Sequence, residues 1–112
     1  MESRLIYESD KTYINRIQWT NPENNSESEW HYLKPTTLSE NQIADILNKK
    51  FTSGILYLVI DRNRSEQINK FNLIPKIIDL YGKTEFKVWD ENFENIIEFK
   101  KEIYREGINA SR

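Results

Sequence analysis

The chain has 112 residues, of which 38% are hydrophobic and 30% charged, and this size and composition fit one domain spanning residues 1–112. Its net charge of −2 provides no overall positive field to attract nucleic acid or an anionic membrane. Because the chain contains no cysteine, disulfides, zinc–thiolate sites, iron–sulfur clusters and cysteine nucleophiles are excluded.

The N-terminal part of the chain is predicted to form three strands around a polar loop. Residues 4–9 and 12–19 are short runs rich in β-branched and aromatic residues, a pattern typical of a β-hairpin. The acidic, turn-forming segment 21–29 is predicted to be a loop. Residues 29–34 are the third strand candidate.

The middle of the chain carries the clearest signals. Residues 39–51 are predicted to form a helix, because Ser39 and Gln42 have the spacing of a capping box and the apolar residues behind them recur with the helical period. Gly54 then separates this helix from residues 55–60. These six consecutive apolar residues suit a central strand that is covered on both faces.

The C-terminal part is predicted to continue as helix, strand and helix. Ser65 begins a helix that Gly82 ends, residues 84–89 alternate as a strand does, and Asp90 begins a last helix that Gly107 ends. The whole pattern predicts an α/β domain with a mixed sheet of about five strands, in which an N-terminal antiparallel meander precedes an α-β-α-β-α segment. We expect the last two strands to be parallel and joined by a right-handed crossover.

Two carboxylates follow the two strands that are expected to be parallel. Asp61 and Asp90 would then meet at the sheet edge where α/β proteins bind ligands, and oxygen ligands suit a divalent cation. The simpler interpretation, which we favour, is that each aspartate stabilises a turn or a helix start. Glu85 and Lys87 have the spacing of half a nuclease signature, but the helix expected before them replaces the hairpin that this motif needs.

Other catalytic signals are weak. His31 is the only histidine and could act as a general base, but its alternation with Trp30 and Tyr32 favours an ordinary place on one strand face. The three glycines are widely spaced, which excludes the G-x-G-x-x-G and Walker A phosphate-binding loops. We therefore expect no cofactor and no metal.

Acidic residues are concentrated in two places. They are Glu23, Glu27 and Glu29 in the loop, and Asp90, Glu91 and Glu94 at the start of the expected last helix. Negative charge at a helix start is favourable by itself, but this does not account for the loop. An acidic surface with an exposed Trp19, Trp30 or Trp89 as an anchor could steer a basic protein partner, since tryptophan is favoured at binding hot spots.

In its size, its acidity and its cysteine-free α/β plan, the chain resembles the small bacterial immunity proteins that neutralise a cognate toxin, including those of contact-dependent inhibition systems. The segment FKVWDENFENIIEF, residues 86–99, carries the resemblance most clearly. The absence of cysteine, the single histidine and the lack of a recognisable catalytic spacing favour a non-enzymatic binding protein, which we expect to be cytoplasmic. The resemblance implies that such a protein covers the basic active site of a toxin, often a nuclease, with an acidic surface. The alternatives are a small metal-dependent hydrolase or nuclease that uses Asp61, Asp90 and Glu85, and a homodimeric interaction module.

Overall fold

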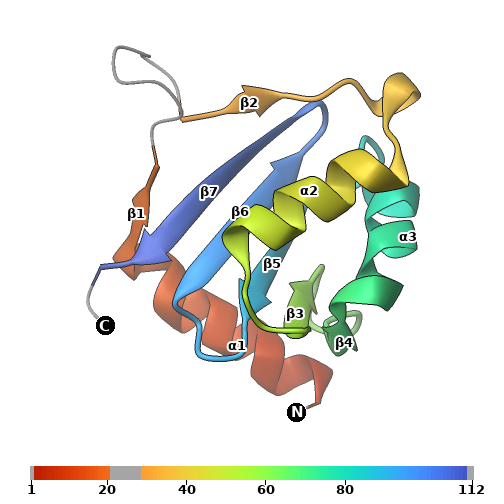
Figure 1. Ribbon diagram of the computed structural model, residues 1–112. Coiled ribbons are helices and arrows are strands. Elements are labelled where there is room, and N and C mark those ends of the chain that lie inside the picture. The colour runs from red at the N-terminus through yellow and green to blue at the C-terminus, as the bar shows by residue number, and fades with distance from the viewer. Residues whose placement is uncertain (1, 21–28, 111–112) are drawn as a thin grey trace.

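The computed structural model describes residues 2–20 and 29–110, in which one antiparallel sheet carries three α-helices (Figure 1). The helices are α1 (Ser3–Tyr13), α2 (Glu40–Lys50) and α3 (Lys70–Leu80), and short 3-10 turns occur at Ile14–Arg16 and Pro35–Thr37. The strands are β1 (Ile17–Trp19), β2 (His31–Tyr32), β3 (Ile55–Val59), β4 (Glu66–Asn69), β5 (Phe86–Asp90), β6 (Asn95–Lys100) and β7 (Ile103–Asn109). None of these helices is long and apolar enough to cross a membrane.

The strands follow the order β1-β7-β6-β5-β3-β4, and β2 also pairs with β7. Because side chains alternate between the two faces of a strand, each central strand contributes to two cores. In β3, Leu56 and Leu58 face α2 and α3, whereas Tyr57 and Val59 face α1. Figure 1 shows the result: α2 and α3 cover one face of the sheet, and α1 lies across the other.

The predicted class, an α/β domain with helices packed on a sheet, is confirmed, although the described residues form seven strands and all pairs are antiparallel. The capping box at α2 is also confirmed: the Gln42 backbone N–H donates to Ser39 Oγ at 3.2 Å, and the Ser39 N–H donates to Gln42 Oε1 at 2.9 Å. The expected parallel pair is wrong, because β3 and β5 run antiparallel with Leu58 opposite Val88.

The predicted N-terminal hairpin is wrong, because its first run is the helix α1. Ile6, Asp10 and Tyr13 recur at helical spacing, and this stripe packs against the sheet: Ile6 and Asp10 are buried, and Tyr13 stacks on Phe93. Residues 4–9 and 12–19 are also rich in β-branched and aromatic residues, which favour strands, so the sequence was ambiguous. The packing of the stripe against the sheet decided the outcome.

The predicted last helix is also wrong, because β6 and β7 form a hairpin in its place. Asp90 ends β5 and stabilises a tight turn in which Phe93 adopts a positive φ of 55°. The helix predicted from Ser65 to Gly82 is also shorter than expected, because α3 begins only at Lys70. Ser65 precedes strand β4, and the N-cap of α3 is Asn69, whose side chain accepts a hydrogen bond from the Asn72 N–H.

Candidate functional site

Arg105 of β7 lies between two indole rings on the sheet face that α1 covers in part. The carbon at the centre of its guanidinium group is 3.6 Å from the ring centroid of Trp19 and 4.5 Å from that of Trp30. The strand register explains this placement, because Trp19 of β1 lies opposite Gly107 and His31 of β2 lies opposite Tyr104. Arg105 therefore occupies the interval between the two strands that pair with this side of β7.

Gly107 allows the first of these rings to approach. A Cβ atom at this position would lie 2.5 Å from Ile17 Cγ2 and 2.9 Å from Trp19 Cε3, closer than real side chains pack. The absence of a side chain lets the Trp19 ring lie across β7 and reach Arg105. A glycine inside a strand often marks such a close approach.

Two carboxylates fix the remaining edges of the guanidinium group. Arg105 Nη2 is 2.7 Å from Oε1 of Glu98, its cross-strand neighbour, and Arg105 Nη1 donates to Glu29 Oε2 at 2.8 Å. Only about a fifth of the Arg105 side chain is exposed, at 20%. Planar stacking and forked hydrogen bonding are properties of arginine that lysine lacks, so the site is specific for this residue.

The row of charges continues across the sheet. Lys87 of β5 lies opposite Glu98, and its ammonium group is 2.7 Å from Asp10 Oδ2 of α1. Asp10 is 2% exposed, and its other oxygen accepts a hydrogen bond from Trp89 Nε1 at 2.8 Å. The sheet face that α1 covers in part thus carries a row of alternating acidic and basic side chains, and side chains of this row form ion pairs with one another.

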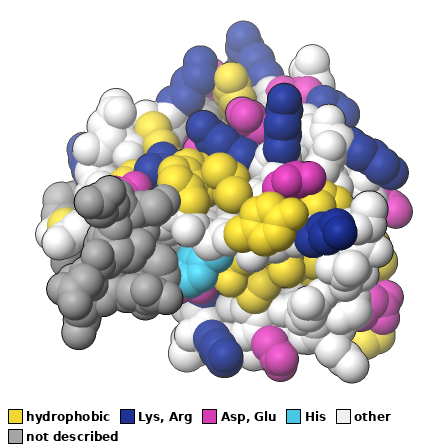
Figure 2. All heavy atoms as spheres, turned by 90° about the horizontal axis from the view of Figure 1, so that it is seen from above, with side chains coloured by type: hydrophobic (Ala, Val, Ile, Leu, Met, Phe, Trp, Pro, Cys, Tyr) yellow, Lys and Arg dark blue, Asp and Glu magenta, His cyan; other side chains and the backbone are white. Residues whose placement is uncertain are grey.

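A groove adjoins the second indole ring. Lys100 Nζ lies 5.4 Å from the Trp30 centroid and also lines a groove of about 650 Å³. The other residues that line the groove are Pro35, Tyr81, Gly82, Lys83, Glu85, Lys101, Glu102 and Ile103. Tyr32, the cross-strand neighbour of Ile103, is 67% exposed. Figure 2 views the molecule from above, where hydrophobic side chains gather among lysine, arginine and acidic side chains.

We call this region the Trp–Arg surface. It comprises Trp19, Trp30, Tyr32, Lys100, Ile103 and Arg105. Its aromatic rings and its arginine come from three strands of one sheet, so the backbone holds them in fixed relative positions. The arrangement presents flat aromatic area around a largely covered guanidinium group, with a hollow beside it, and these features are suited to recognising another molecule.

Four of the seven predicted partner-binding residues belong to the segment before β2. Glu29 and Trp30 contact Arg105 and lie within or beside the Trp–Arg surface. Glu23 and Glu27 lie outside the described residues. The carboxylate of Glu29 therefore forms an ion pair with Arg105. Its side chain is 42% exposed, so it also faces solvent.

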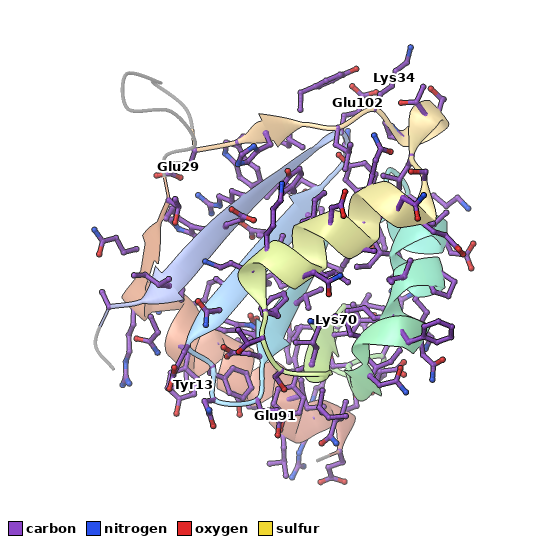
Figure 3. All side chains as sticks on the ribbon, viewed as in Figure 1. Tyr13, Glu29, Lys34, Lys70, Glu91 and Glu102 are labelled. Atoms are coloured by element: carbon purple, nitrogen blue, oxygen red, sulfur yellow. The ribbon has the colours of Figure 1, made fainter. Side chains whose placement is uncertain are left out.

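The other three predicted residues lie in the β5–β6 turn, well separated from Glu29 (Figure 3). Asp90 Oδ1 accepts hydrogen bonds from the backbone N–H groups of Glu94 at 2.8 Å and Asn95 at 3.2 Å. Glu91 Oε1 accepts a hydrogen bond of 2.6 Å from Ser53 Oγ. Asp90 thus has a structural role in this turn, whereas Glu91 and Glu94 are exposed.

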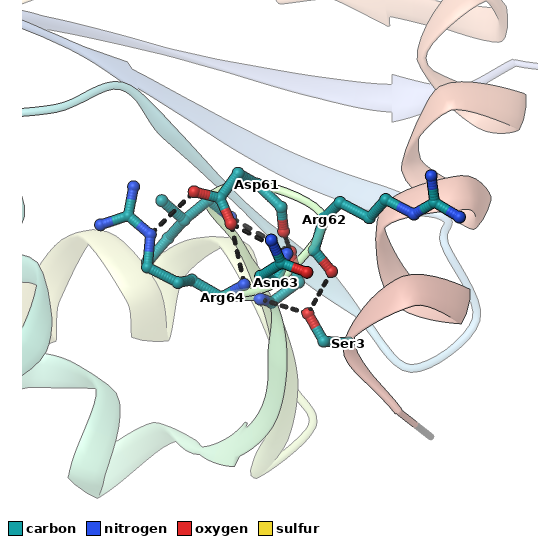
Figure 4. A network of polar contacts seen from close by, with 7 residues as sticks. Ser3, Asp61, Arg62, Asn63 and Arg64 are labelled. Carbon is teal, nitrogen blue, oxygen red and sulfur yellow. Dashed lines mark hydrogen bonds and ion pairs between the residues drawn. The ribbon is translucent and has the colours of Figure 1, made fainter.

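Asp61 and Asp90 do not meet, as the hydrolase alternative requires, because antiparallel pairing puts them at opposite ends of β3 and β5. Asp61 instead organises the turn after β3, where Oδ1 accepts from the Asn63 and Arg64 N–H groups and Oδ2 from Arg64 Nε (Figure 4). The hydrogen bond from the Arg64 side chain lowers the pKa of Asp61 below its ordinary value. Glu85 precedes β5 and so also lies away from Asp90. Residues 2–20 and 29–110 contain no group of three acidic or histidine side chains arranged to hold a metal.

His31 lies on the face of β2 opposite Tyr32, as its alternation with the flanking aromatic residues predicts. Its ring stacks on Tyr104, with centroids 4.7 Å apart and planes inclined by 8°. Burial raises the pKa of the Tyr104 hydroxyl, so this group is a neutral neighbour at physiological pH. The stack anchors β2 to β7 on the face that carries α2.

Sequence reasoning named Trp19 and Trp30 among three possible tryptophan anchors but missed Arg105; the third, Trp89, is buried against Asp10. Arg105 falls in the segment predicted to be helical, where its cross-strand contact with Glu98 could not be foreseen. The signal that could have revealed it is Gly107: read as a strand glycine, it indicates a close approach by a large ring.

Comparisons of the chain with protein-family models, with curated proteins and with solved structures found no match. These comparisons therefore assign the chain to no family. The proposal below depends on the geometry of the Trp–Arg surface and on the sequence.

Proposed function

We propose that this chain is a non-enzymatic protein-binding protein and that the Trp–Arg surface is its contact site. The observation that carries the proposal is the guanidinium group of Arg105, which lies over the rings of both Trp19 and Trp30, near the strand that carries the exposed ring of Tyr32. Tryptophan, tyrosine and arginine are the residues in which binding energy is concentrated at protein interfaces.

Preorganisation supports this proposal. The side chain of Arg105 already makes hydrogen bonds with Glu98 and Glu29, and Lys100 lies over the Trp30 ring. Ordering a long side chain on binding costs about 0.5–1.5 kcal/mol, and a side chain that is held in place beforehand avoids much of that cost. The surface therefore offers large contact area without a large loss of side-chain entropy.

The groove suggests what the partner presents. Its lining combines apolar side chains, among them Pro35 and Ile103, with three lysines and two glutamates, so the lysines are in excess: Lys83, Lys100, Lys101, Glu85 and Glu102. We propose that an apolar or aromatic partner side chain enters this groove and that partner carboxylates meet the lysines. Such pairing chiefly sets orientation and association rate.

Neutralisation of a bacterial toxin is the narrower form of this proposal, and the sequence resemblance suggests it. In this form the exposed Glu91 and Glu94 of the β5–β6 turn supply a second, acidic contact for basic groups of the toxin. The product of a neighbouring toxin-like reading frame is the natural candidate. Co-expression should restore growth to cells that produce this toxin, and failure to restore growth would contradict the narrower form alone.

A quantitative pull-down from the encoding organism tests the broader proposal. We compare the wild-type chain with Tyr32→Ser, which removes an exposed ring from the surface, and with Leu5→Ser, a control that removes an exposed apolar side chain from α1. A specific partner should be recovered equally by the wild type and Leu5→Ser, and about tenfold less by Tyr32→Ser. Equal recovery by all three chains would contradict the proposal.

A further inference from the structure

Phe71 projects from the first turn of α3 at the far edge of the sheet from the Trp–Arg surface. It is 83% exposed, more than any other large hydrophobic side chain in residues 2–20 and 29–110. A phenyl ring left in water gives up the ~1.5–3 kcal/mol that burying such a side chain would contribute. The fold of one copy does not use this ring.

Two hollows flank Phe71, and both are lined by Phe71 and Ile74. One, of about 470 Å³, is completed by Asn48, Gly54, Asn69 and Lys70. The other, of about 280 Å³, is completed by Glu40, Asn41, Ala44, Asn72 and Pro75. The patch is therefore a ridge, formed by Phe71 and Ile74, between two depressions. The larger hollow is wide and open to solvent, so an aromatic ring of a neighbouring molecule can reach it.

The two hollows are poorer in charge than the chain as a whole, of which 30% is charged, because only two of their eleven lining residues carry a charge. Four asparagines occupy the rim of the patch: Asn41, Asn48, Asn69 and Asn72. Lys70, labelled in Figure 3, is one of its two charged residues, and its ammonium group donates to the Phe51 carbonyl oxygen at 2.8 Å. The other is Glu40, at the start of α2, where the helix dipole favours a carboxylate.

We propose that this patch binds a second copy of the same chain across a twofold axis, with Phe71 of each copy seated in the larger hollow of the other. A twofold interface brings the same patch from both copies together, so it needs a ridge beside a hollow on one surface. A twofold interface also brings each charged side chain close to its own copy. A patch lined by asparagines avoids most of this repulsion. Asparagine side chains both donate and accept hydrogen bonds, so they can pair with their own copies.

Sedimentation equilibrium over a range of protein concentrations tests this assignment. The wild type should dimerise, and Phe71→Ser should raise the dimer dissociation constant by at least about tenfold. Tyr32→Ser is the matched control, because it removes the other widely exposed ring and should leave dimerisation unchanged. Thermal unfolding of each variant confirms that the exposed substitution leaves the fold intact.

A second, independent test of dimerisation places a charge in the patch. Asn72→Lys puts like charges near the axis, so dimerisation should weaken at low salt and recover as salt screens the repulsion. A wild type that stays monomeric up to about 1 mM would overturn the proposal. So would a dimer that Phe71→Ser leaves unchanged or that Tyr32→Ser disrupts equally. Because the partner pull-down depends on Tyr32 and this test on Phe71, either proposal can fail without the other.

Discussion

Arg105 combines at one residue the contacts that a planar cation can make. Its guanidinium carbon lies over the Trp19 ring at 3.6 Å and over the Trp30 ring at 4.5 Å, and carboxylates bind its nitrogens at 2.7–2.8 Å. A lysine ammonium is a compact point charge and cannot reproduce this arrangement. The contribution of the residue to stability therefore depends on the shape of its side chain as well as on its charge.

Arg105→Lys should lower the free energy of unfolding by about 1–3 kcal/mol, because it loses the stacking and the forked hydrogen bonds while keeping the charge. Urea unfolding monitored by tryptophan fluorescence measures the loss. Arg62→Lys, at an exposed position, is the control and should leave stability within about 0.5 kcal/mol of wild type. Equal stability of the two variants would mean that only the charge of Arg105 matters.

Tyr81 links the groove to stability at alkaline pH. Its hydroxyl donates to the Leu33 carbonyl oxygen at 2.7 Å, and burial raises its pKa above the ordinary value of 10.0. A raised pKa in the folded state means that this stabilising contribution is present below pH 10 and is lost as the pH rises towards the folded-state value.

Tyr81→Phe should therefore reduce stability at neutral pH by about 1 kcal/mol through loss of the hydrogen bond. The difference in the free energy of unfolding between wild type and variant should shrink above pH 10, because ionisation of the tyrosine then stabilises the unfolded wild type. Urea unfolding at a series of alkaline pH values measures both effects. If this difference stays constant with pH, the pKa of the Tyr81 hydroxyl is not raised in the folded state.

At the scale of elements, α1 is attached to the sheet by a buried polar contact as well as by apolar packing. Asp10 accepts hydrogen bonds from Lys87 and from the Trp89 indole, which lie on the same strand face. Removing one partner of a buried ion pair leaves the other desolvated without compensation, which costs about 3–5 kcal/mol. The position of α1 should be sensitive to this single residue.

Asp10→Ala should lower the free energy of unfolding by about 3 kcal/mol and speed amide exchange throughout α1. Glu8→Ala, an exposed change on the same helix, is the control and should stay within about 0.5 kcal/mol of wild type. Denaturant unfolding and hydrogen–deuterium exchange give the two readouts. If α1 exchanges as slowly in Asp10→Ala as in wild type, apolar packing alone holds the helix.

The pairing of β1 with β7 depends on Gly107. Gly107→Ala would put a Cβ atom 2.5 Å from Ile17 Cγ2, so β1 must shift, at a cost of about 1–3 kcal/mol. The shift should also move Trp19 off Arg105 and change the tryptophan emission spectrum. Gly54→Ala is the control, since no atom lies within 4 Å of its added Cβ. Equal effects of the two substitutions would contradict the close approach.

Over the whole molecule, the elements that could be predicted are those with strong local signals. Helix α2 has its capping box, and β3 is a continuous apolar run between polar segments. The errors fall where one pattern fits two structures. Phe93, Ile96 and Ile97 have helical spacing, yet they lie in a turn and a strand, because pairing with β5 and β7 buries the two isoleucines.

The candidate site was predictable only in part for the same reason. Composition alone marked Glu29 and Trp30 as candidates, and both lie at the Trp–Arg surface. Arg105 depends on a contact with Glu98 across a hairpin that the sequence did not reveal. Asp90 suits a helix start and a tight turn equally well, and only the turn explains its hydrogen bonds.

The two proposed binding regions lie at opposite edges of the sheet, the Trp–Arg surface beside β1 and β2 and the Phe71 patch beside β4. A dimer formed through the patch would leave the Trp–Arg surface of each copy accessible. Partner binding and dimerisation should then be independent, and the Tyr32→Ser and Phe71→Ser variants separate them.

The central claim is that a partner protein covers the Trp–Arg surface, and hydrogen–deuterium exchange of the captured complex tests it most directly. The account predicts that binding slows exchange in β2 and around the β6–β7 turn, where Tyr32, Lys100 and Ile103 lie. Protection confined to other elements, such as the β5–β6 turn or the start of α3, with unchanged exchange in β2 and β7 would contradict the claim.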